Sequence, residues 1–177
     1  MSRPAITLCT ILLLLIPIIG NTEQIESNGN VEVFFLHRGG AAEPIIKEIN
    51  FAKSEILMQT KSFTDKPISQ ALVDARKRGV KIVTIMDKGQ EKDKNTLLDL
   101  IHKAGIPVFF DLEHALDHNK IIIIDRITLI TGSFDFTKTE NNNVENLLIL
   151  KGNKLLVDKY IKNFEEHRGH SENYKGN

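Results

Sequence analysis

Short runs of aliphatic and β-branched residues alternate with helix-like segments from residue 31 onward, and this alternation restricts the possible fold most strongly. The runs are short and apolar, as buried strands are, while the intervening segments carry apolar residues at helical spacing. The predicted strands are 31–36, 55–60, 80–86 and a run that begins at 108. The predicted helices are 44–52, 68–78 and 96–104. Strands that alternate with helices predict an α/β fold, a mostly parallel sheet with helices on both faces.

The second half of the chain departs from this regular alternation. Two strand-like runs, 120–124 and 127–131, follow each other almost directly, and a third at 147–150 precedes an amphipathic helix at 154–166. The adjacent runs predict a hairpin, so we expect a mixed sheet rather than a wholly parallel one. The tail from Gly169 is polar and is expected to be frayed.

The first 22 residues have the character of a signal peptide. A short positive start, 1–3, is followed by an apolar run at 5–19. This run suits a signal-peptide core and is shorter than the roughly 20 residues that span a bilayer as a helix. We therefore expect residues 1–22 to be a signal peptide and 23–177 to form one exported domain, either periplasmic or secreted. An uncleaved membrane anchor is the alternative.

Composition excludes several classes of function. The chain has 23 Lys and Arg against 23 Asp and Glu. This balance argues against the uniformly basic surface of a nucleic-acid coat protein but leaves a local phosphate site open. The one cysteine, Cys9, lies in the predicted signal peptide. The exported domain therefore has no cysteine for a nucleophile, a disulfide or a thiolate-ligated metal.

The stretch from His118 to Ser133 combines three side chains that suit phosphate chemistry. His118 and Lys120 are two residues apart on a predicted strand, so their side chains share a face. If 125–126 is a two-residue turn, Lys120 opposes Thr131 and His118 opposes Ser133. One patch would then hold a nucleophilic imidazole, an ammonium group and a hydroxyl donor.

The same stretch resembles the signature of the phospholipase D superfamily. His118-x-Lys120-x4-Asp125-x6-Gly132-Ser133 matches the HxKx4Dx6GS motif, and the continuation to Asn143-Val144-Glu145-Asn146 is similar to small bacterial Nuc-type endonucleases. The resemblance extends over most of residues 31–166. The motif residues assigned to catalysis are His118, Lys120 and Asp125. Those assigned to phosphate binding or orientation are Ser133, Glu145, Asn143 and Asp135.

The resemblance implies a mechanism and an assembly. Such proteins cleave phosphodiesters without a metal or other cofactor, through a covalent phosphohistidine, and two motif copies form one site. This chain has one copy, so a homodimer is implied. One His118 would attack phosphorus while His118 of the partner subunit protonates the leaving oxygen and later activates water. Lys120 and Ser133 would hold the non-bridging oxygens, and Glu145 would orient the imidazole.

Two aspartates in this region call for separate interpretations. Asp125 lies at the predicted turn, seven residues after His118. Residues an odd number apart on a strand point to opposite faces, so we expect Asp125 to brace the hairpin backbone rather than face the substrate. Asp135 stands where the relatives usually have Asn. A carboxylate beside an anionic phosphodiester repels it unless the carboxylate is protonated or turned away.

The remaining histidines and the basic cluster are interpreted as surface features. Arg76–Arg78 is expected to be a solvated helix end, where cations complement the helix dipole, rather than a DNA track. No metal site is predicted, because the other histidines lack metal-ligand spacing. They are His37, His102, His114, His167 and His170.

Three functions remain open at this stage. The first is an exported, metal-independent endonuclease that acts on DNA and on RNA as a further substrate, favoured by the small size and the Nuc-like continuation. The second is a phospholipase D that hydrolyses phosphatidylcholine-like lipids to phosphatidate, although no amphipathic segment with Trp supports interfacial binding. The third is a catalytically impaired dimer that retains a phosphate pocket, and Asp135 is its motivation.

Overall fold

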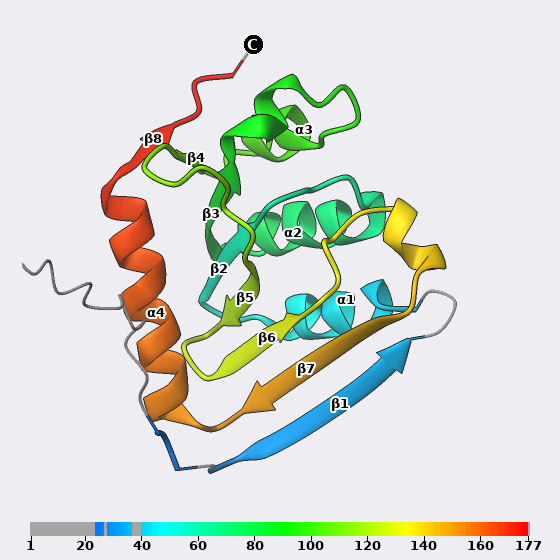
Figure 1. The fold of residues 1–177 in the computed structure, drawn as a ribbon, viewed down its shortest axis with the longest axis vertical. Coiled ribbons are helices and arrows are strands. Elements are labelled where there is room, and N and C mark those ends of the chain that lie inside the picture. Colours follow the sequence, from blue (N-terminus) through cyan, green and yellow to red (C-terminus); the bar gives the residue numbers. More distant parts are fainter. Residues whose placement is uncertain (1–23, 27, 37–39, 177) are drawn as a thin grey trace, which may run out of the picture.

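Eight strands form one mixed sheet in the computed structural model, which describes residues 24–26, 28–36 and 40–176 (Figure 1). The whole predicted signal peptide, residues 1–22, and His37 lie outside these residues. The strands are β1 (Asn30–Leu36), β2 (Glu55–Thr60), β3 (Lys81–Asp87), β4 (Val108–Asp111), β5 (Lys120–Ile124), β6 (Thr128–Gly132), β7 (Glu145–Lys151) and β8 (Ser171–Asn173). The helices are α1 (Ala42–Phe51), α2 (Lys66–Lys77), α3 (Leu98–Lys103) and α4 (Lys154–Gly169), with short 3₁₀ turns at Lys88–Lys92 and Thr139–Asn142.

The strand order across the sheet is β1-β7-β6-β5-β2-β3-β4-β8. The predicted mixed α/β sheet is confirmed, but the balance of strand directions differs from the prediction. Within the described residues, β2 with β3 and β3 with β4 are the parallel pairings, and the other five pairings are antiparallel. The parallel pairings come from the crossovers through α2 and α3 in the first half of the chain, whereas the close β5–β6 connection permits only antiparallel pairing.

Helices cover both faces of the sheet, as predicted. One core packs α1, α2 and α3 against the sheet and includes Ile45, Leu72 and Ile101. The opposite face is covered by α4 through Val157, Ile161 and Phe164 (Figure 1). Among the helices of the described residues, none has the length and apolar character that crossing a membrane requires.

The β5–β6 hairpin has a different register from the predicted one. Ile121, not Lys120, pairs with Thr131, so the predicted opposition of Lys120 and Thr131, and of His118 and Ser133, is wrong. The turn contains three residues, 125–127, because Ile124 already pairs with Thr128. Asp125 and Arg126 take positive φ angles of 52° and 58°. This left-handed pair closes the chain tightly, and the added Ile127 shifts the pairing by one residue.

The C-terminal tail is ordered rather than frayed. β8 pairs antiparallel with β4 at the edge of the sheet. Tyr174 is buried, its N–H donates to the carbonyl of Val108 at 2.8 Å, and its hydroxyl donates to Asp99 at 2.6 Å. The polar sequence of this segment does not predict a strand. The strand is held by main-chain pairing with β4 and by the buried side chain of Tyr174.

Candidate active site

Lys120 and Asp135 form a nearly buried ion pair at the centre of the motif. Lys120 begins β5 and pairs with Thr60 of β2, so the sheet fixes its backbone. Its Nζ lies 2.9 Å from Asp135 Oδ1, and the two side chains are 10% and 11% exposed. Lys120 Nζ also donates to the carbonyl of His118 at 3.2 Å. Asp135 is thus turned inward onto Lys120, one of the two ways in which its repulsion of a phosphodiester can be reduced.

His118 lies just before this pair along the chain, and its side chain is exposed. No hydrogen bond or ion pair joins its ring to another described residue, so the imidazole is free to meet a substrate. The backbone around it is fixed on both sides. Asp117 Oδ1 accepts from Asn119 Nδ2 at 2.8 Å, and Lys61 N–H donates to the carbonyl of Asn119 at 3.3 Å.

Hydrogen bonds of the buried Asp117 also fix the loop that carries His118. Asp117 is 3% exposed, and its Oδ2 accepts from Gln59 Nε2 on β2 at 2.8 Å. Its own N–H donates to Asp87 Oδ2 at the end of β3 at 3.1 Å. The loop that carries His118 is therefore tied to the carboxyl ends of β2 and β3, where ligands commonly bind in α/β sheets.

Ser133, Glu145 and Asn143 form a second polar group. Ser133 Oγ donates to Glu145 Oε2 in a very short contact, and Asn143 Nδ2 donates to Glu145 Oε1 at 3.2 Å. Asn146 N–H donates to Ser133 Oγ at 3.0 Å, which fixes the serine where β6 ends beside β7. Within the described chain Glu145 contacts Ser133 and Asn143, and its expected role in orienting His118 stays a prediction.

Glu140 is a site residue that the sequence motif does not indicate. Its Oε2 accepts a short hydrogen bond from the N–H of Asp135. Burial raises the pKa of Glu140, and the neighbouring carboxylates of Asp135 and Glu145 raise it further against the opposing effects of that hydrogen bond and of Lys120. Glu140 thus adds a third carboxylate to the motif region beside Asp135 and Glu145, and its raised pKa favours the protonated, uncharged form.

Asp125 is not brought together with these residues. It follows the far end of β5, roughly 16 Å along the strand from Lys120. Its carboxylate accepts from the N–H groups of Lys53, Ser54 and Glu55 and from the Ser54 hydroxyl, at 2.8–3.0 Å. Burial raises the pKa of Asp125, but these hydrogen bonds outweigh it and hold the pKa below its ordinary value. The geometry therefore gives Asp125 a bracing role between β5 and β2 and separates it from the catalytic set.

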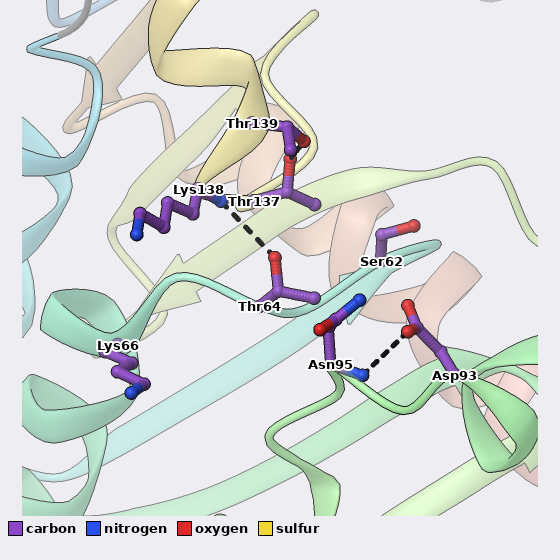
Figure 2. Close-up of a pocket in the computed structure, with 8 residues that line it drawn as sticks. All are labelled: Ser62, Thr64, Lys66, Asp93, Asn95, Thr137, Lys138 and Thr139. Carbon is purple, nitrogen blue, oxygen red and sulfur yellow. Dashed lines mark hydrogen bonds between the residues drawn. The ribbon is translucent and has the colours of Figure 1, made fainter.

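A polar pocket of about 510 Å³ is lined by segments that continue from β2 and from Asp135 (Figure 2). Its lining residues come from the segments after β2, after Asp135 and before α3, and all of them are polar or charged. They are Ser62, Thr64, Lys66, Asp93, Asn95, Thr137, Lys138 and Thr139. Ser62 lies two residues beyond Thr60, and Thr137 lies two beyond Asp135, so both walls continue from residues that flank Lys120. Lys138 N–H donates to Thr64 Oγ1 at 3.3 Å and holds the walls together.

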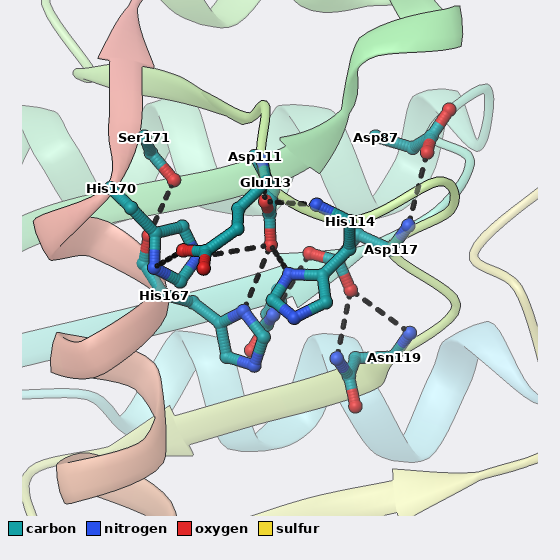
Figure 3. Close-up of polar contacts among 10 residues, drawn as sticks. Asp87, Asp111, Glu113, His114, Asp117, Asn119, His167, His170 and Ser171 are labelled. Atoms are coloured by element: carbon teal, nitrogen blue, oxygen red, sulfur yellow. Dashed lines mark hydrogen bonds and ion pairs between the residues drawn. The ribbon is translucent and has the colours of Figure 1, made fainter. Parts of the chain in front are cut away.

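A second polar cluster, missed by the sequence interpretation, lies at the other end of the His118 loop (Figure 3). Asp111, His114, His167 and His170 each place a potential ligand atom within 4.8 Å of the others. The sequence interpretation places these histidines on the surface: His114 is exposed, whereas His167 and His170 are partly buried, and all three face the Asp111 carboxylate. His114 and His167 are 53 positions apart in the sequence, so no local spacing could reveal the cluster. The packing of α4 and β8 against β4 brings its residues together.

The amino-acid sequence is similar to those of known proteins. Residues 45–168 match the family described as "Cardiolipin synthase, PLD-like domain". Phospholipase D of Rickettsia prowazekii (strain Madrid E) is 35% identical over 139 residues, which cover 78% of this chain and 67% of the relative. Mitochondrial cardiolipin hydrolase of Mus musculus is 27% identical over 150 residues, which cover 76% of this chain and 68% of the relative.

The fold comparison agrees with the sequence comparison. The crystal structure of Nuc from Salmonella typhimurium, a phospholipase D family member, superimposes with a TM-score of 0.79 and 30% identity. The match covers 84% of this chain and all of that one. The chain therefore belongs to the phospholipase D superfamily and is a phosphodiester hydrolase.

Proposed function

We propose that this protein hydrolyses phosphodiesters in nucleic acid without a catalytic metal, as a homodimer in which two copies of His118 share one site. The observation that supports the substrate assignment is the polar pocket formed by the segments that follow β2 and Asp135. None of its eight lining residues has a purely hydrocarbon side chain, and Lys66 and Lys138 contribute ammonium groups. Cationic and hydroxyl-lined grooves suit a charged backbone that continues beyond the scissile phosphate.

The chemistry assigned to His118 has two steps. A ring nitrogen of one His118 forms a bond to phosphorus as the phosphorus–oxygen bond to the leaving group breaks. His118 of the partner subunit gives its proton to the leaving oxygen and then, as a base, takes a proton from water. That water attacks phosphorus, breaks the phosphorus–nitrogen bond and releases the phosphate product. An imidazole can act as a nucleophile, a general acid and a general base, which suits these roles.

Lys120 and Ser133 are assigned to the charge on the phosphate. In the single chain Lys120 is paired with Asp135, and Ser133 donates to Glu145. A bound phosphate would compete for both donors, so substrate binding is expected to rearrange these contacts rather than fill a preformed anion hole. Lys120 and Ser133 would then stabilise the negative charge on the transferring phosphoryl group.

Apolar side chains near the motif support the assembly part of the proposal. Phe35 is 74% exposed and lies opposite Asn146 in the β1–β7 pair, and Val144, next to Glu145, is also 74% exposed. Exposed apolar groups rimmed by polar ones mark contact surfaces. We assign them to the surface between two chains, because one motif copy per chain requires a partner at this position.

Phospholipid is the second candidate substrate. Two of the relatives are named phospholipase D and mitochondrial cardiolipin hydrolase, which makes lipid phosphodiesters a specific alternative. The same Phe35 and Val144 side chains could contact acyl chains if they are not covered by a partner subunit. Export of the protein is a further part of the proposal, and it rests on the apolar segment at residues 5–19.

The test is a direct comparison of two substrates with the purified full-length protein. Supercoiled DNA and phosphatidylcholine vesicles are each incubated in excess EDTA with wild type and with His118→Ala. The proposal predicts nicking of DNA that the variant loses, with little release of phosphatidate. Phosphatidate release without nicking would replace nucleic acid with lipid as the substrate. Inactivity on both by folded, dimeric protein would favour an impaired phosphate-binding protein.

A further inference from the structure

Three imidazoles converge on one carboxylate oxygen at the end of β4. Asp111 Oδ2 lies 2.8 Å from His167 Nδ1, 3.0 Å from His114 Nδ1 and 3.4 Å from His170 Nε2. The ring centroids are 5.0–5.4 Å apart in all three pairs. Asp111 is 3% exposed, whereas the rings close the cluster from its solvent side (Figure 3).

The carboxylate is offered more donors than it can accept. Asp111 Oδ1 accepts from the N–H groups of Glu113 at 2.9 Å and His114 at 3.3 Å. With three ring nitrogens around Oδ2, five donors face a group that has about four acceptor sites. At least one imidazole nitrogen therefore points at Oδ2 without a good hydrogen bond.

His170 makes the longest of these three contacts, with Nε2 3.4 Å from Asp111 Oδ2. Its other ring nitrogen, Nδ1, lies 2.9 Å from Glu113 Oε2. A carboxylate that fixes the outer nitrogen of a histidine is the usual partner of metal-bound imidazole.

We propose that Asp111, His114, His167 and His170 bind one divalent transition metal, with Zn²⁺ as the favoured ion. Three nitrogens and one carboxylate oxygen match the ligand types and tetrahedral coordination of zinc. Calcium and magnesium prefer all-oxygen sites, so they fit poorly. Tetrahedral zinc separates its ligand atoms by about 3.3 Å. The four donors, which already lie within 4.8 Å of one another, therefore need a small inward movement.

The site would link segments that are distant in sequence. Asp111 and His114 belong to the end of β4 and the loop after it, whereas His167 and His170 belong to the end of α4 and the residue that follows it. Four protein ligands leave no open coordination position, which makes the role structural rather than catalytic. His118 follows in the same loop but is fixed separately through Asp117 and Asn119. Loss of the metal should thus lower thermal stability and leave the chemistry at His118 intact in folded protein.

Zinc stoichiometry tests the proposal without reference to activity. The purified full-length protein is stripped with a chelator, equilibrated with Zn²⁺ by dialysis and analysed for bound metal. We expect one zinc per chain in wild type and in His118→Ala, and none in the double variant His114→Ala/His167→Ala. Zinc should also raise the Tm of wild type. Wild type that binds no zinc, a double variant that retains it, or loss in His118→Ala would each overturn the assignment.

Two further measurements keep the test valid if the double variant does not fold. Co²⁺ bound to wild type should give the visible d–d absorption of a tetrahedral site, whereas an octahedral spectrum would contradict the ligand set. Glu113→Gln keeps all four ligands and removes the outer carboxylate, so zinc affinity should fall by about 10- to 100-fold. An unchanged affinity would contradict the role assigned to His170.

Discussion

The Nζ atom of Lys120 lies 2.9 Å from Oδ1 of Asp135, and both side chains are about nine-tenths buried. The motif cation is therefore paired with the carboxylate two residues after the motif serine. A phosphate that approaches Lys120 must weaken this pair or bind beside it. The pair thus controls both how strongly the site attracts an anion and how stable the unliganded site is.

The variant Asp135→Asn should bind substrate more tightly than wild type. The amide can still accept from Lys120 but no longer opposes the phosphate charge, so KM should fall by roughly three- to tenfold, about 1 kcal/mol. Steady-state kinetics at several salt concentrations measures this change. Glu165→Gln, which removes a surface carboxylate paired with Arg168, is the matched control. A higher KM in Asp135→Asn would show that the carboxylate supports the site.

The variant Asp125→Ala should lose stability and keep its catalytic constants. Removal of the carboxylate leaves three backbone N–H groups and the Ser54 hydroxyl without their acceptor, and we expect a loss of about 1–3 kcal/mol in the free energy of unfolding. Urea unfolding gives this value. Asp158→Ala, which breaks an exposed i,i+4 pair with Lys154, should cost about 0.5 kcal/mol or less. Reduced activity at unchanged stability would return Asp125 to the catalytic set.

The contribution of Asp125 should also depend on pH. Its folded-state pKa lies below its ordinary value of 3.8, so the folded state favours the ionised form. The stability that it supplies is complete above the unfolded pKa and is lost as pH falls through the folded pKa. The stability difference between wild type and Asp125→Asn should be constant above about pH 5 and shrink below about pH 4. A difference that grows towards acid would contradict this sign.

Mixed dimers should be inactive if one site needs both copies of His118. Wild type and His118→Ala, refolded together in equal amounts, would give about a quarter wild-type dimers by random pairing. Activity should then fall to about a quarter of that of the same total amount of wild type. Independent sites in each chain would instead leave about half, which would contradict the shared site.

The pocket lysines should contribute to nucleic-acid affinity and not to the chemical step. Lys66→Gln combined with Lys138→Gln should raise KM for DNA and leave kcat unchanged. The dependence of KM on salt should also become shallower, by about one released ion for each lysine–phosphate interaction that the substitutions remove. Lys175→Gln, outside the pocket, is the control. If the double variant hydrolyses DNA like wild type, the pocket does not bind the backbone.

Much of the fold could be predicted because local patterns coincide with the elements. The bounds of β2 and β5 match the predicted 55–60 and 120–124, where uninterrupted apolar runs end at polar residues. The hairpin register could not be predicted, since it depends on Asp125 and Arg126 both adopting positive φ angles that neither residue strongly favours.

The site could be predicted only in part, because some of its residues meet through tertiary contacts that no local sequence pattern encodes. Lys120 is found beside Asp135, and Ser133 beside Glu145, because short connections join their strands. His114 and His170 meet through a tertiary contact between β4 and the end of α4, and no periodicity encodes such a contact. Glu140 belongs to no sequence motif. It is identified in the structure by the hydrogen bond that its side chain accepts from the N–H of Asp135.

The most direct test of the account is hydrolysis of bis(p-nitrophenyl) phosphate, a small diester with neither base nor lipid, in excess EDTA. The measurement is made well below the Tm of the metal-free protein. Wild type and His102→Asn, a histidine variant outside the site, should release nitrophenol at similar rates, and His118→Ala should be slower by roughly a thousandfold or more. Wild-type activity abolished by EDTA in folded protein, or full activity in His118→Ala, would contradict the metal-independent histidine mechanism.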